Sequence, residues 1–98
     1  MDSTVFMSKI EKIEGQVMEE VDGSREYTNC AAKWAGENAT ISSSYASMAK
    51  QELEHATKLN GFLNEMKSNP ELTEDQVAVV KFLVEMNAGQ IKKAAIER

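Results

Sequence analysis

The sequence predicts an all-α fold, in which an antiparallel helical hairpin is followed by a shorter third helix. Apolar side chains recur at alternating spacings of three and four residues, as in helices that pack at a shallow angle. Residues typical of turns interrupt this pattern at 36–40 and again at 68–70. Strand-like alternation of polar and apolar residues occurs nowhere in the chain. A length of 98 residues suits one small core, so we expect a single helical domain over residues 1–98.

The first helix is expected to end before the turn at 36–40. The positions on its contact face are Ile10, Ile13, Val17, Glu20, Ser24, Tyr27, Ala31 and Trp34. Glu20 is the acid in this row. A carboxylate at a helix contact is costly unless it is paired or binds a metal ion, so Glu20 is a candidate ligand.

The second helix repeats the same spacing and contains two further candidate ligands. Its row is Ile41, Tyr45, Met48, Glu52, His55, Leu59, Phe62 and Met66. Glu52 and the only histidine, His55, are three residues apart, so both can reach one ion from the same helix face. An antiparallel hairpin through 36–40 brings Glu20 level with Glu52 to within about one helical turn.

A capping box at Thr73–Gln76 marks the start of the third helix, after Pro70. The apolar band of this helix is broader than one neighbouring helix can cover, which indicates contacts between copies of the chain. Glu85 lies within the band. We favour a position on its polar edge, and a role as an additional ligand is the alternative.

Composition narrows the class of protein. The net charge of −5 argues against nucleic acid as a partner, because phosphate binding needs a basic face. No apolar run reaches the roughly 20 residues of a membrane span, so no membrane partner is expected. Cys30 is the only cysteine and cannot form an internal disulfide, which favours a cytoplasmic location.

Two stretches, EVDGSREYTNCAAKWA and MAKQELEHATKLNGFL, resemble the first two helices of the ferritin-like superfamily, and within it rubrerythrin. Such bundles hold a pair of metal ions with one glutamate from each of two helices and Glu-x-x-His from each of the other two. The resemblance implies that Glu20, Glu52 and His55 are metal ligands. It also implies that Tyr27 lies near the metal, where it would act as a catalytic residue.

The chain departs from rubrerythrin in carrying half of this ligand set. Its third helix has no second Glu-x-x-His, and no fourth helix follows. In this respect it is similar to half-ferritins, including encapsulated ferritins, in which two hairpins meet across a dimer interface. The similarity implies a homodimer that forms a ferritin-like four-helix bundle, or a higher homo-oligomer. An encapsulating shell protein is a further candidate partner, and a protein nanocompartment a further candidate location.

Symmetry leads independently to the same ligand set. Two copies of Glu20, Glu52 and His55 supply four carboxylates and two imidazoles, which suit a pair of iron ions, with manganese as the alternative. The functional hypothesis is a di-iron protein that oxidises Fe(II) with O₂ or peroxide, as a ferroxidase or a rubrerythrin-like peroxidase. The alternative is a metal-free helical dimerisation or protein-interaction module, whose acids at the contact set register and partner choice.

Overall fold

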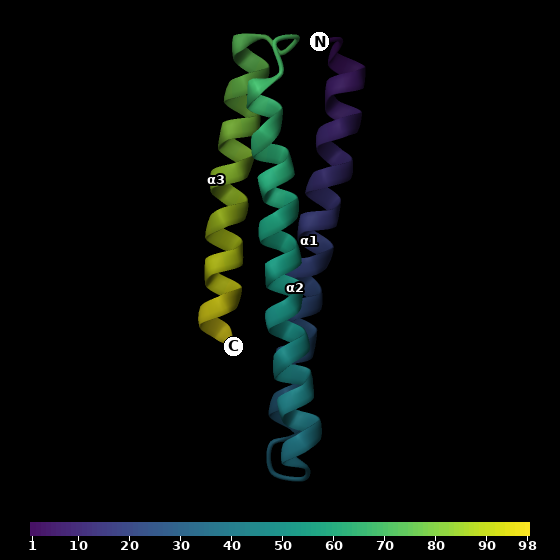
Figure 1. The fold of residues 1–98 in the computed structure, drawn as a ribbon, viewed down its shortest axis with the longest axis vertical. Helices are drawn as coiled ribbons and strands as arrows, with labels where there is room; N and C mark the ends of the chain where they lie inside the picture. Colours follow the sequence, from purple (N-terminus) through teal and green to yellow (C-terminus); the bar gives the residue numbers. More distant parts are fainter.

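The chain forms three α-helices and one short 3-10 helix. A computed structural model describes all residues 1–98 and contains α1 (Ser3–Trp34), α2 (Ala39–Glu65), η1 (Met66–Ser68) and α3 (Glu74–Glu97). The helices run side by side, with α1 and α2 as the long hairpin and α3 along part of its length (Figure 1). This architecture confirms the predicted all-α hairpin with a shorter third helix. No helix combines the length and apolar character that crossing a bilayer requires.

Side-chain caps begin α2 and α3 close to the predicted boundaries. The Asn38 side chain accepts a hydrogen bond of 3.1 Å from the backbone N–H of Ile41 and so begins α2. At the start of α3, Thr73 and Gln76 form the predicted capping box, with reciprocal hydrogen bonds of 3.0 and 3.1 Å. These local interactions fix the two reversals of chain direction that bring the three helices together.

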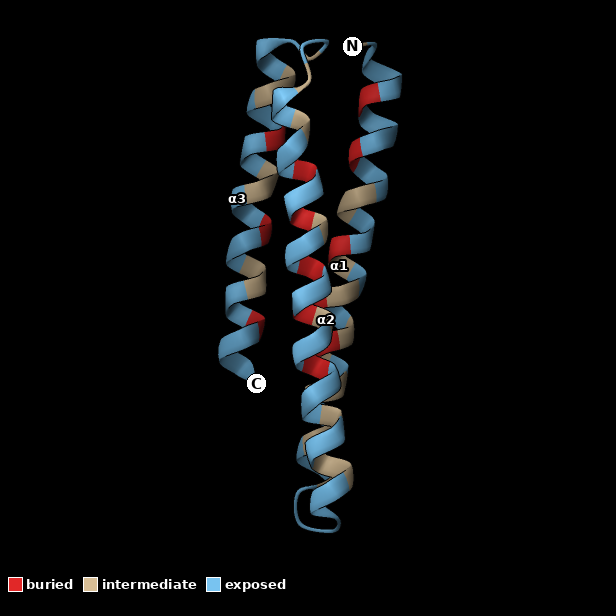
Figure 2. Ribbon diagram, viewed as in Figure 1, coloured by how far each residue is buried: buried red, intermediate tan, exposed pale blue.

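The core consists of two apolar clusters along the inner faces of the helices (Figure 2). The cluster near the N-terminus of α1 contains Phe6, Ile10, Leu63 and Val80. The cluster near the middle of α1 contains Val17, Val21, Leu53, Ala56 and Ala94. Each cluster has members from all three helices, so α3 is held to the hairpin by apolar burial along its length.

The buried face of α2 lies one residue away from the predicted one. Its buried residues are Ala49, Leu53, Ala56, Asn60 and Leu63. The predicted row is wrong as a buried row, because Met48, His55 and Phe62 are exposed, Phe62 by 57%. The difference arises because α2 contacts α1 and α3 together. Small side chains such as Ala56 bring the helices close at that contact, whereas the prediction followed the larger apolar side chains.

A buried polar network connects all three helices. Asn87 of α3 is fully buried, and its Nδ2 donates to Glu14 Oε2 at 2.7 Å and to Asn60 Oδ1 at 3.1 Å. Asn60 Nδ2 in turn donates to the backbone carbonyl of Val84 at 3.1 Å. Buried amides need such partners, so this network favours one register of α3 against the hairpin.

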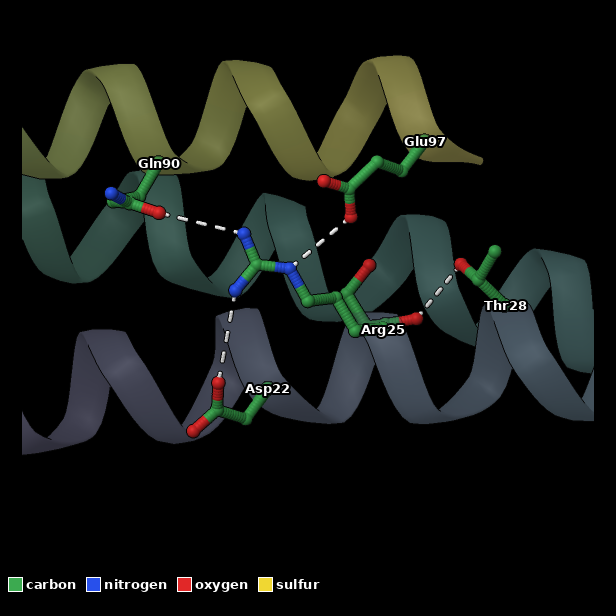
Figure 3. Close-up of polar contacts among 6 residues, drawn as sticks. Asp22, Arg25, Thr28, Gln90 and Glu97 are labelled. Carbon is green, nitrogen blue, oxygen red and sulfur yellow. Dashed lines mark hydrogen bonds and ion pairs between the residues drawn. The ribbon is translucent and has the colours of Figure 1, made fainter.

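Arg25 of α1 ties the last turns of α3 to the hairpin (Figure 3). Its Nε donates to Glu97 Oε2 at 3.2 Å, and its Nη2 donates to Gln90 Oε1 at 3.4 Å. Asp22, one turn before Arg25, lies 3.9 Å from Nη1 and completes the ion pairs. Beyond the end of α3 the hairpin continues as two helices, and no residue from 25 to 48 is buried (Figure 2).

Candidate metal centre

Three potential metal ligands meet at the edge of the α1–α2 contact. Glu20 comes from α1, and Glu52 and His55 come from consecutive turns of α2. One ligand atom from each of these side chains can be chosen so that all three atoms lie within 4.8 Å of one another. The structure therefore brings together the residues that the sequence singled out. Their role as metal ligands stays a prediction.

The environment of Glu20 fits a cation. Glu20 Oε2 is buried and has no hydrogen-bond partner, and a buried carboxylate oxygen is costly unless it is paired. The imidazole of His55 lies beside it, with Nδ1 at 3.5 Å from Glu20 Oε2. The side chain of Glu20 is 26% exposed and that of His55 58% exposed. The cluster thus has a buried oxygen on one side and an imidazole open to solvent on the other.

Gly23 makes room for Glu52. A Cβ on residue 23 would stand 3.0 Å from Glu52 Oε2, closer than side chains normally pack. The missing Cβ lets this carboxylate lie against α1, beside Glu20 on the preceding turn. Glycine inside a long helix is unfavourable relative to alanine, so its position here was an available sequence signal.

The two carboxyl groups influence each other's ionisation. Hydrogen bonding to Glu20 raises the pKa of Glu52 above its ordinary value, and burial and charge repulsion from Glu20 raise it further. His55 opposes these effects, because a nearby imidazolium favours the ionised carboxylate and lowers the pKa of Glu52. The two carboxyl groups repel each other when both are ionised. A divalent cation bound between them would relieve this repulsion.

The ligand residues of α2 lie beside its core-facing residues. Glu52 and His55 each directly precede a residue of the core cluster that includes Ala94 of α3, namely Leu53 and Ala56. One residue corresponds to a rotation of roughly 100° about the helix axis, so the ligands lie to one side of the core-facing residues of α2.

The other predicted site residues lie outside this cluster. Tyr27 is half-buried two turns further along α1, and its ring centroid is 6.1 Å from that of Tyr45. No contact between Tyr27 and the ligands defines a catalytic role. Glu85 is exposed on α3 and does not belong to the ligand group, which agrees with the favoured polar-edge position.

The match of one family model places this helical chain in the ferritin-like superfamily. The family model described as Rubrerythrin matches residues 12–95, a span that contains all three candidate ligands. The chain therefore belongs to the rubrerythrin family, whose domains typically bind iron. No curated protein and no solved structure matches the chain.

Proposed function

We propose that this protein is a non-haem di-iron carboxylate protein that oxidises Fe(II) with O₂ or peroxide. The observation that carries the proposal is the convergence of Glu20, Glu52 and His55 within 4.8 Å, in a family whose domains typically bind iron. The buried oxygen of Glu20 lacks a hydrogen-bond partner, and the room left by Gly23 holds the carboxylate of Glu52 beside it, so two carboxylates are available to an ion between the two helices.

A second copy of the chain completes the site in this proposal. The cluster provides three ligands, half of the set that a pair of ions requires in such bundles. Met48 and Phe62 are exposed on the same face of α2 as Glu52 and His55, and they offer apolar area for a homodimer contact. A two-fold axis beside this face would supply four carboxylates and two imidazoles, with iron as the favoured metal and manganese as the alternative.

The residues of the chain have distinct tasks in this function. Glu52 and His55 hold one ion together, and the carboxylate of Glu20 neutralises charge between the two helices. Because its pKa is raised, Glu52 retains a proton more readily, and this proton must leave when metal binds. Iron, when bound, supplies one electron per Fe(II) for the reduction of O₂ or peroxide. The exposed imidazole of His55 keeps the site open to ions from solvent.

Tyr27 retains its proposed catalytic role, as a hydrogen-bonding residue on the side of the cluster nearer the hairpin turn. Helical side chains tend to lean toward the helix N-terminus, which from Tyr27 is the direction of Glu20. A Tyr27→Phe variant keeps the packing against Tyr45 and removes the hydroxyl group. In this proposal it binds iron normally and oxidises it more slowly.

Anaerobic titration with Fe(II), followed by admission of air, tests the function. We expect uptake of about one iron per chain and a rise in near-ultraviolet absorbance on oxidation. The same samples, run on a sizing column, report the dimer. Glu52→Ala and His55→Ala should lose both uptake and oxidation. Glu54→Ala removes an exposed acid from the same turn of α2 and should behave like the wild type.

Iron uptake equal to that of the wild type in all three variants would overturn the di-iron proposal. The metal-free interaction module would then be favoured, since the exposed Met48 and Phe62 give it a contact surface. In that module Glu52→Ala removes a half-buried acid, so the dimer should be retained or strengthened.

A further inference from the structure

The helix α3 carries a second row of residues, four of them large and apolar, that no other part of the chain covers. Its members alternate at spacings of three and four residues: Val79, Phe82, Met86, Gly89, Lys93 and Ile96. Phe82 is 65% exposed and Ile96 is 77% exposed, and Val79 and Met86 are exposed as well. We call these residues the outer row of α3. It extends for about 26 Å along the helix.

The outer row is separate from the face that α3 buries in the core. The buried residues of α3 are Val80, Asn87 and Ala94, each one residue after a member of the outer row. These buried residues pack α3 against the hairpin. The outer row is rotated from them by roughly 100° about the axis of α3, toward solvent. A continuous exposed row at this spacing is typical of a helix that packs against another helix.

We propose that the outer row docks against the same row of a second copy, with the two α3 helices antiparallel about a two-fold axis. This interface is distinct from the one that completes the metal centre. Antiparallel pairing centred between residues 86 and 89 sets Met86 against the partner's Gly89. A Cβ at position 89 would meet nothing within 4 Å, so open space is present there for a methionine side chain.

Charge complementarity selects the antiparallel arrangement. Glu85 and Lys92 are both exposed and flank the outer row on the same side. Antiparallel pairing brings Glu85 close to the partner's Lys92, and symmetry repeats this pair at the other end. It also sets Lys93 over the ring of the partner's Phe82, a favourable contact between a cation and an aromatic face. Parallel pairing would instead place Lys93 against its own copy within the contact.

Sedimentation velocity of the metal-free protein, in chelator and low salt, tests this interface independently of the metal centre. We expect a concentration-dependent association that Met86→Glu removes, because it puts a charge into the contact. Glu85→Lys and Lys92→Glu each bring like charges together twice and should weaken the association about tenfold. The double variant Glu85→Lys/Lys92→Glu exchanges the charges and should restore the wild-type dissociation constant to within about threefold.

Lys81→Glu is the matched control, because Lys81 is exposed on α3 and lies outside the outer row. It should leave the association unchanged. The proposal is overturned if the wild type gains no association step that Met86→Glu abolishes, or if the double variant is as weak as the single ones. Iron uptake in Met86→Glu should be normal, so failure at this interface is distinguishable from failure of the metal centre.

Discussion

Gly23 and Glu52 are in such close register that a Cβ on residue 23 would lie 3.0 Å from the carboxylate oxygen of residue 52. We therefore predict opposite effects of Gly23→Ala on stability and on metal binding. Alanine favours the helix by up to about 1 kcal/mol, so thermal unfolding of the metal-free protein should move to higher temperature. The displaced carboxylate should weaken iron binding by roughly tenfold to a hundredfold, measured by titration.

Gly15→Ala is the control for this prediction. Gly15 lies in the same helix, and a Cβ there meets nothing within 4 Å. It should raise stability by a similar amount and leave iron affinity unchanged. If Gly23→Ala binds iron as tightly as Gly15→Ala, the close approach has no bearing on the site.

The raised pKa of Glu52 predicts a pH dependence for the metal-free protein. The folded state holds this proton more tightly than the unfolded state, whose carboxyl group titrates near the ordinary value of 4.5. Its stabilising contribution is complete below that value and is lost as pH rises through the raised folded-state pKa. Glu52→Gln keeps a neutral, hydrogen-bonding side chain, so it should be more stable than the wild type near pH 7.

Thermal melts in chelator between pH 4 and pH 7 measure this difference. The curve for Glu52→Gln should fall less steeply with rising pH than the wild-type curve. With iron present the order reverses, because the wild type gains binding free energy that the variant lacks. Parallel curves in chelator would show that the two carboxyl groups do not interact in solution.

Loss of the buried amide in α3 should destabilise the whole bundle. Asn87→Ala removes the donor to Glu14 and Asn60 and leaves their oxygens unpaired, at a cost of about 1–3 kcal/mol. Urea unfolding followed by circular dichroism measures this cost. Asn64→Ala, at an exposed position of α2, should change stability by no more than about 0.5 kcal/mol.

Arg25→Ala should loosen one end of α3 and leave the rest in place. The contact of Arg25 to Glu97 is exposed and the contact to Gln90 is partly buried, so their joint loss should cost about 1 kcal/mol. Hydrogen exchange should accelerate in residues 90–97 and stay at the wild-type rate in residues 74–86. Uniform acceleration throughout α3 would show that Arg25 supports the whole helix.

Local sequence signals predicted the helices and their ends. The turn before Asn38 and the capping box at Thr73 act through neighbouring residues, so they could be found without knowledge of the packing. Helix geometry also predicted that Glu20 lies at about the same level of the hairpin as Glu52 and His55. The exact contact face of α2 could not be obtained in this way, because it depends on two partner helices at once.

Interactions between distant parts of the chain were not visible in the sequence. Asn87 and Arg25 read as ordinary polar residues of helices, and only the position of α3 brings them to their partners. The close approach of Gly23 to Glu52 likewise depends on the distance between two helix axes. The spacing of residues shows on which face of a helix a side chain lies. It does not show how closely two helices pack, and these contacts depend on that distance.

The two-helix end of the hairpin gives the molecule a local unfolding unit. No residue from 25 to 48 is buried, so we expect this end to open at a free energy below that of global unfolding. The last buried positions before it are Ser24 and Ala49, within about one helical turn of Glu20 and Glu52. Fraying of the hairpin end thus reaches the border of the ligand cluster while the three-helix body stays folded. The protein can relax one wall of that cluster and rebuild it without passing through the denatured state.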